Sequence, residues 1–273
     1  MNVEPLTAKT IQRDGQRLNW VDAGGAGLPV VFQHGLCGDA RQTAEVFPND
    51  PRFRLITLEC RGHGGSAASA EAELTIAAFA SDVAALIDEL GGAPVVIGGI
   101  SMGAAIALRL AVTRPDLVRA MIIARPAWVT GAAPQNMQPN AEVGRLLGVL
   151  PPAAARAEFT TGDIFRRLSA EAPENLASLL GFFDREPVAM TARLLTAIAA
   201  DGPGVTEAAV RRLNVPTLVI GTERDAIHPW SFAHTIADLI PSATLVTITP
   251  KATDKVAYVR EFQQALQAFL EDI

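Results

Sequence analysis

The chain has 273 residues, of which 49% are hydrophobic and 19% are charged, and its formal net charge is −6 at pH 7. This length and composition are ordinary for a globular protein that buries a large core, and they exclude a disordered chain. The charges are spread out, without a long basic run or a lysine-rich amphipathic face, so we expect neither nucleic acid nor a membrane as a partner.

The start of the chain and its two cysteines indicate a cytoplasmic protein. Residues 1–10 lack an apolar core behind a basic start, and no run approaches the ~20 apolar residues of a membrane span. Cys37 and Cys60 form neither a disulfide framework nor a metal-binding spacing, so reduced thiols are expected. Because each follows a predicted central strand, the two can lie near each other, and a redox link between them is a minor alternative.

Apolar strands alternate with helical stretches along the chain, which is typical of a largely parallel sheet covered on both faces. The predicted strands are Lys9–Arg13, Arg17–Asp22, Val30–Gln33, Arg54–Leu58, Val95–Gly98, Val118–Ala124, Thr217–Gly221 and Thr244–Ile248. The first two are predicted to form an antiparallel hairpin across Asp14-Gly15. The predicted helices between the later strands are Ile76–Leu90, Met102–Thr113, Trp230–Leu239 and Val256–Leu270. The last helix is expected to face the sheet with Val256, Val259, Phe262, Leu266 and Phe269.

Residues 127–212 interrupt this alternation. They are helical in pattern, rich in alanine and leucine, and broken by prolines. We therefore predict an inserted helical cap at 127–212, and a core made of residues 1–126 and 213–273. The cap holds more apolar side chains than it needs to cover the sheet, Trp128 among them. Most are expected to pack on one another, and a subset to line an apolar pocket.

The segment Gly99–Gly103 reads G-I-S-M-G and lies between an apolar strand and a helix of small residues. A strand that turns sharply into a helix through G-x-S-x-G is a nucleophile elbow. Glycines flank the serine because the strained turn leaves no room for neighbouring Cβ atoms. Ser101 is therefore predicted to be presented to substrate, with a helix start behind it that favours negative charge.

Two further motifs precede the elbow, H-G-L-C-G at 34–38 and R-G-H-G-G-S at 61–66. Together with the elbow, they make the chain similar to the α/β-hydrolase superfamily over nearly all of its length. The resemblance implies an α/β fold, with a mostly parallel eight-stranded sheet flanked by helices. The predicted cap also falls where that superfamily carries its lid, between the sixth and seventh strands.

The resemblance implies attack of the Ser101 hydroxyl on an acyl carbon, with backbone donors for the oxyanion. By similarity, those donors are the N–H groups of Leu36 and Met102. His34 is interpreted as a residue that orients its loop, with a role as base the lesser alternative. His63 is expected to shape the glycine-rich turn below the site.

The acid of the site is predicted after the strand at 217–221. Asp225 follows that strand at its carboxyl end, where the superfamily places the carboxylate that orients its histidine. Glu223 is a weaker candidate. Arg125 stands where some relatives carry their acid; it cannot replace a carboxylate, but it can bind an acidic substrate group or pair with a cap residue.

The base is the point of departure from the superfamily. The superfamily normally carries its catalytic histidine in the loop after the last strand. Here that loop, Thr249–Lys255, contains no histidine. Three hypotheses remain: His228 serves as base, a lysine such as Lys251 does so, or no triad exists and Ser101 only donates a hydrogen bond. His234 is expected on a helix surface.

We therefore predict a carboxylesterase-like serine hydrolase for a small hydrophobic ester, lactone or thioester, with Ser101, Asp225 and His228 as its triad. The alternative is a noncanonical member of the fold, either a lyase, isomerase or cyclase or a ligand-binding protein. His34, Arg125 and Trp128 are expected around the substrate. Dehalogenase and epoxide hydrolase activities are disfavoured because both use a carboxylate at the elbow. No metal or organic cofactor is expected, and the chain is expected to be a monomer or homodimer.

Overall fold

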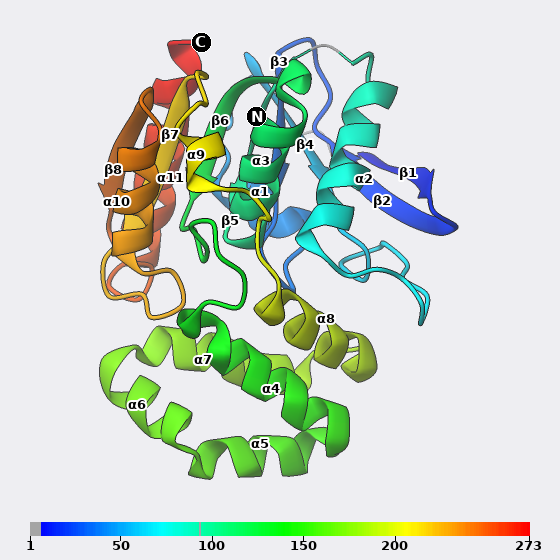
Figure 1. Cartoon of the computed structure of the whole chain (residues 1–273), viewed down its shortest axis with the longest axis vertical. Coiled ribbons are helices and arrows are strands. Elements are labelled where there is room, and N and C mark those ends of the chain that lie inside the picture. The colour runs from blue at the N-terminus through cyan, green and yellow to red at the C-terminus, as the bar shows by residue number, and fades with distance from the viewer. Residues whose placement is uncertain (1–6, 93) are drawn as a thin grey trace.

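A single eight-stranded sheet forms the centre of the computed structural model, which describes residues 7–92 and 94–273 (Figure 1). Its strands are β1 (Thr7–Arg13), β2 (Gln16–Asp22), β3 (Leu28–Gln33), β4 (Phe53–Leu58), β5 (Val95–Ile100), β6 (Val118–Ala124), β7 (Thr217–Thr222) and β8 (Ala243–Ile248). Across the sheet the order is β1-β2-β4-β3-β5-β6-β7-β8. Strand β2 is antiparallel to both neighbours and every other pair is parallel. The predicted fold class is confirmed.

The predicted hairpin between β1 and β2 turns at Asp14 and Gly15. Both residues have positive φ, at 47° and 74°. Two-residue hairpin loops need this backbone because its twist matches the twist of the strands, and Asp-Gly is a favoured pair for it. The local sequence therefore specifies this end of the sheet.

Helices cover both faces of the sheet. One face carries α2 (Ile76–Glu89), α3 (Met102–Thr113) and α10 (Trp230–Leu239), and the other carries α1 (Ala40–Val46) and α11 (Lys255–Glu271) (Figure 1). A 3₁₀ turn at Pro115–Leu117 leads from α3 into β6. All residues of β5 are buried, because helices pack on both sides of it. This fully buried strand ends immediately before Ser101.

Two details differ from the sequence-based expectation. Helix α1 was not predicted; it is a short helix that begins where the Asp39 side chain accepts a hydrogen bond from the N–H of Arg41. In α11, Val256 is 75% exposed, because the first turn directs it away from the sheet. The buried stripe instead starts at Tyr258 and continues through Phe262 at helical spacing.

A layer of helices lies beyond the carboxyl ends of the parallel strands (Figure 1). We call it the helical layer; it comprises the 3₁₀ turns η2 (Gln135–Met137) and η3 (Phe182–Asp184) and the helices α4 (Gln138–Val149), α5 (Pro152–Thr161), α6 (Asp163–Glu171), α7 (Pro173–Gly181) and α8 (Val188–Ala200). The extensive contacts of these elements are with one another.

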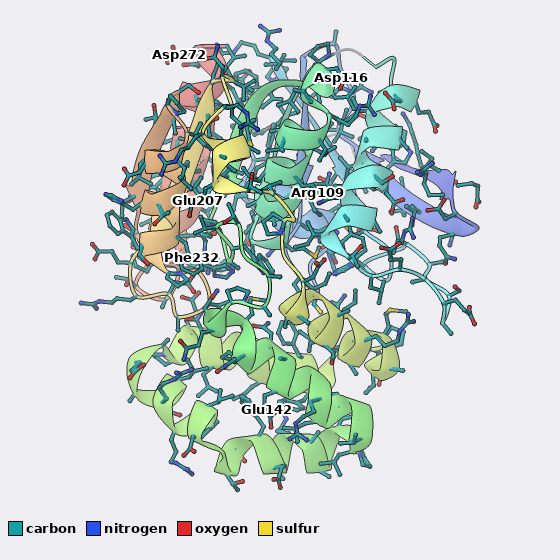
Figure 2. All side chains as sticks on the ribbon, in the orientation of Figure 1. Arg109, Asp116, Glu142, Glu207, Phe232 and Asp272 are labelled. Atoms are coloured by element: carbon teal, nitrogen blue, oxygen red, sulfur yellow. The ribbon has the colours of Figure 1, made fainter. Side chains whose placement is uncertain are left out.

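The chain returns from the helical layer to the core before α9 (Glu207–Val210), which packs on α3. Figure 2 shows Arg109 of α3 beside this returning segment. Its guanidinium donates hydrogen bonds to the carbonyl oxygens of Pro203 and Gly204, at 3.0 and 3.3 Å. Within the described residues, no helix has the length and apolar character to cross a bilayer.

Candidate active site

Ser101 stands at the turn between β5 and α3. Its backbone has φ 57° and ψ −108°, a conformation that a serine rarely adopts. A Cβ on Gly103 would lie 2.3 Å from the carbonyl oxygen of Gln33, and one on Gly99 would lie 2.5 Å from the carbonyl carbon of Gly103. Only glycine fits on either side of the serine, as the motif requires. The strained turn is anchored by the Ser101 N–H, which donates to the carbonyl oxygen of Ala124 at 2.9 Å.

His228 lies against Ser101, although the two are far apart in the sequence. The Oγ of Ser101 is 2.9 Å from Nε2 of His228. The other ring nitrogen, Nδ1, lies 3.0 and 2.9 Å from the two carboxylate oxygens of Asp225. A carboxylate only accepts, so Nδ1 carries the proton and Nε2 is free to accept the proton of the serine hydroxyl. The three residues form one continuous chain of hydrogen bonds.

The loop between β7 and α10 supplies both the acid and the base. Oδ1 of Asp225 accepts hydrogen bonds from the backbone N–H groups of Ile227 and His228, at 3.1 and 2.9 Å. Asp225 thereby closes a tight local turn of the kind that aspartate side chains favour. The Asp225 side chain thus orients the imidazole and also shapes the backbone that carries it. A separation of three residues between the acid and the base is therefore sufficient to bring them into contact.

The other candidates for base and acid lie elsewhere. Lys251 lines the same cavity as Ser101, but its ammonium is 3.6 Å from the carboxylate of Glu45. His234 is an exposed residue of α10 whose Nδ1 is 3.0 Å from Asp238. Glu223 is exposed on the loop that follows β7. The structure therefore brings His228 and Asp225 to Ser101, and not these three residues.

Arg125 is the cation beside the acid. Its Nε and Nη2 donate to Oδ2 of Asp225 at 3.2 and 2.5 Å, and Nη2 is 3.3 Å from Nδ1 of His228. Burial by itself would raise the pKa of the Asp225 carboxyl. The charges of His228 and Arg125, with their hydrogen bonds, outweigh burial and hold that pKa well below its usual range. Asp225 is therefore ionised in the folded protein near neutral pH.

The loop at 34–38 faces Ser101 and is fixed by two buried histidines. His63 Nε2 accepts from the N–H of Cys37 at 3.0 Å, and His34 Nε2 accepts from the N–H of Cys60 at 3.1 Å. These bonds tie the two glycine-rich motifs together. His34 has no exposed surface and does not line the cavity, so its position matches the loop-orienting interpretation rather than contact with substrate.

Leu36 and Met102 were predicted to donate to an oxyanion. Leu36 lines the cavity, and Met102 follows Ser101 at the first position of α3. In the part of the chain that the structure describes, the N–H of neither residue has an acceptor. Two unused backbone donors flanking a nucleophile can stabilise a developing negative charge.

The cavity above Ser101 has a volume of about 330 Å³. Apolar side chains line part of it, including Leu36, Ile100, Met137, Leu179, Phe182 and Ile227. Polar side chains line the rest, including Gln42, Asn140, Glu174, Asn175, Ser178 and Lys251. The lining is thus more polar than the sequence indicated. A larger open depression, about 550 Å³, lies between α4, α8 and residues 72–74, but it contains no part of the hydrogen-bonded chain at Ser101.

Trp128 does not reach this cavity. It is 2% exposed, and its indole N–H donates to the carbonyl oxygen of Asp201 at 2.9 Å. That bond joins the two segments that enter and leave the helical layer, so the tryptophan packs between connections instead of against substrate. Trp128 was expected around the substrate, but the structure places it behind the residues that line the cavity.

Sequence reasoning missed the asparagines of the helical layer. Asn175 and Asn140 are at least nine-tenths buried and line the cavity, and Asn136 bonds to the loop that carries His228. Nothing in the local pattern singles them out, because an asparagine in an alanine-rich helical segment is usually exposed. Tyr258 of α11 was also missed; its hydroxyl accepts a hydrogen bond from Nη1 of Arg125 at 3.5 Å.

Comparison with known proteins places the chain in a family. The model of the alpha/beta hydrolase fold matches residues 29–252. The chain is 35% identical over 157 residues to lipase LipV of Mycobacterium tuberculosis, covering 55% of this chain and 58% of that protein. It is 31% identical over 236 residues to the putative non-heme bromoperoxidase BpoC of the same species, covering 83% and 87%. An esterase structure from Exiguobacterium antarcticum superposes with a TM-score of 0.74 at 20% identity, covering 97% and 100%.

The chain therefore belongs to the α/β-hydrolase fold family, as its three motifs indicated. The family match and the similarity to lipase LipV support a hydrolase. The esterase structure, at its low identity, supports the fold alone.

Proposed function

We propose that the protein is a serine hydrolase that cleaves a small ester, lactone or thioester through an acyl-enzyme at Ser101. The observation that carries the proposal is the continuous chain from Ser101 Oγ through His228 to Asp225, with contacts of 2.9 to 3.0 Å. This is the arrangement that activates a serine hydroxyl in unrelated folds.

In the proposed first step, Ser101 Oγ attacks the acyl carbon while its proton passes to Nε2 of His228. The carbonyl oxygen becomes an oxyanion, which the N–H groups of Leu36 and Met102 stabilise. The bond from carbon to the leaving oxygen or sulfur then breaks, and His228 returns the proton to the leaving group. Water, deprotonated by His228, attacks the acyl-enzyme in the second step and releases the acid and the free serine.

Asp225 stabilises the imidazolium that forms in each step, since it is ionised and in contact with Nδ1. Arg125 neutralises part of the negative charge of the Asp225 carboxylate and holds it in place. It also lines the cavity, so it can contact an acidic group of the substrate. A cavity of about 330 Å³ is at the lower end of the range for small-molecule sites, which favours a short acyl or alcohol part. Its mixed lining favours a substrate with both apolar and hydrogen-bonding groups.

We also propose that the helical layer acts as a cap over this cavity. It supplies the lining residues Met137, Asn140, Ser178 and Phe182, whereas the core supplies Ser101 and the loop at 35–38. The non-hydrolytic alternative rests on the lack of a base. The position of His228 Nε2, 2.9 Å from Ser101 Oγ, supports hydrolysis over that alternative.

The test is the intact mass of the protein after exposure to a small fluorophosphonate. Attack by Ser101 Oγ on phosphorus forms an O–P bond and expels fluoride, so an activated serine gains one phosphonyl group. We expect stoichiometric labelling of the wild type, none in Ser101→Ala, and a rate lowered by roughly 10³-fold or more in His228→Ala.

Lys251→Met is the matched control, because it removes the competing base from the same cavity. It is expected to leave the labelling of Ser101 within a few-fold of wild type. Labelling that survives in His228→Ala but disappears in Lys251→Met would reverse the assignment of the base, and an unlabelled wild type would contradict the hydrolase.

A further inference from the structure

The four residues 225–228 carry both the acid and the base, and side chains of the helical layer hold them. Asn175 of α7 donates from Nδ2 to Oδ1 of Asp225 at 2.9 Å, and its own Oδ1 accepts from the N–H of Ala226 at 2.8 Å. Its amide therefore spans the acid and the following peptide. Asn175 is 7% exposed, so water does not readily replace these bonds.

A second asparagine of the layer holds the same loop from another element. Asn136 of η2 donates from Nδ2 to the carbonyl oxygen of Ile227 at 2.7 Å and to that of Ala127 at 3.0 Å. Ile227 directly precedes His228 in the chain. Two amides from separate elements thus fix the backbone between the acid and the base.

The nucleophile half of the site is built differently. Ser101 is anchored within the sheet by its bond to Ala124, and the 34–38 loop is anchored by His63. Both anchors belong to the core. Among the described residues, the half of the site that holds Asp225 and His228 is the one that receives hydrogen bonds from the helical layer.

The helical layer is also a unit of its own. Its helices make their most extensive contacts with one another. Hydrogen bonds such as that from Arg193 to the carbonyl oxygen of Ser69 join it to the core, together with apolar side chains such as Leu194, which belongs to the same buried cluster as Leu74. A unit attached in this way can shift as a body at lower cost than a helix packed on the sheet. Any shift that separates α7 from the loop also removes the Asn175 bonds.

We propose that Asn175 and Asn136 are positioning residues that make the acid and base competent only while the helical layer is docked. This inference rests on the proposed hydrolase. When the layer moves to admit substrate, Asp225 and His228 lose their alignment, and docking over bound substrate restores it. The layer thereby couples closure of the cavity to activation of Ser101, so the serine is least reactive when the site is open.

The experiment measures the rate of fluorophosphonate labelling at a series of probe concentrations in the full-length protein. The variants are Asn175→Leu and Asn136→Leu, which remove the amides at similar volume. Gln138→Leu is the matched control, since it removes an exposed amide of the same layer that does not line the cavity. Far-UV circular dichroism and the melting temperature show whether each variant is folded.

We expect the maximal labelling rate to fall by about 10-fold or more in Asn175→Leu and by less in Asn136→Leu, because a small misplacement of the base is costly. The probe concentration at half-maximal rate stays near wild type, because the amides act on the base and not on probe binding. Gln138→Leu labels at the wild-type rate. Folded variants that label as fast as wild type would overturn the inference while leaving the hydrolase intact.

Asn175→Asp provides a readout that a purely structural role would not move. It keeps the size and the acceptor for Ala226 but sets a second carboxylate beside Asp225. Added negative charge favours the protonated imidazole, so the acid limb of the labelling rate moves to higher pH. An unmoved acid limb contradicts the inference, and this variant also serves if Asn175→Leu does not fold. A wild type that is not labelled at all overturns the hydrolase, and the inference with it.

Discussion

The carboxylate of Asp225 holds several parts of the site through its hydrogen bonds. Its two oxygens accept from Arg125, Asn175 and the imidazole and backbone of His228, in addition to Ile227. These donors explain why a buried carboxyl has a lowered pKa instead of the raised one that burial alone produces. The carboxylate is therefore both a catalytic group and a structural centre of its loop.

Arg125→Met separates these two roles. The substitution leaves a buried carboxylate without its guanidinium, so the free energy of unfolding at pH 7 is expected to fall by roughly 2 to 4 kcal/mol. The rate of Ser101 labelling is expected to fall only slightly, because the N–H donors still hold Asp225 against His228. Urea titrations and labelling rates at pH 7 measure the two effects.

The pH dependence of that loss has a defined sign. The lowered pKa of Asp225 gives stability that is present above the unfolded pKa of about 3.9 and is lost as the pH falls below it. In Arg125→Met the folded pKa moves back toward the unfolded one, so the difference from wild type shrinks in acid. A difference that grows between pH 7 and pH 4 would contradict this account.

The elbow between β5 and α3 shows how one element constrains the next. Strand β5 is buried between β3 and β6, and α3 starts immediately after Ser101, so the helix crosses the end of β3 at close range. The absence of side chains at Gly99 and Gly103 is what permits this approach. Close packing of backbone against backbone cannot relax as a flexible side chain can.

Gly103→Ala is therefore expected to destabilise the protein by about 3 kcal/mol or more, since its methyl group would meet the backbone of Gln33. Gly148→Ala is the control within a helix. That glycine of α4 has open space around its Cβ position, and alanine there is expected to stabilise by up to about 1 kcal/mol. Chemical denaturation of both variants at pH 7 provides the comparison, and equal stabilities would show that the close approach is not limiting.

The two glycine-rich motifs are joined in the folded protein through His34 and His63, whose ring centroids are 4.8 Å apart. Burial lowers the pKa of each imidazole, and for His63 the neighbouring His34 adds to the effect. Both rings accept a backbone N–H at Nε2, which requires the neutral form. The folded protein thus holds two histidines that cannot readily take up a proton.

Stability is expected to fall as the pH drops below about 6.5, because the unfolded chain binds protons there that the folded protein does not. Each histidine contributes a slope of up to about 1.4 kcal/mol per pH unit. Urea titrations between pH 7.5 and 5 measure this slope, in a window above the range where carboxyl groups titrate. A constant free energy of unfolding over this window would contradict the prediction.

Local patterns in the sequence determined most of the architecture. The Asp14-Gly15 turn, the strand at 118–124, the helices at 102–113 and 230–239 and the elbow at Ser101 depend on residues that are neighbours in the chain. Their periodicity and turn chemistry act over a few residues, so the sequence alone specifies them. The position of the acid after β7 was implied by the resemblance to the superfamily and not by local pattern, and Asp225 contacts His228 there.

Only the tertiary structure decided which residue stands against Ser101. His228 and Lys251 were both open candidates, and the difference between them is where two loops point after β7 and β8, which depends on long-range packing. The sequence also did not predict three other features. These are the asparagines of the helical layer that hold the loop, the polar lining of the cavity, and the position of Trp128 outside that cavity. A hydrogen bond between side chains far apart in sequence leaves no local pattern, because its geometry exists only once the sheet and the helical layer have assembled.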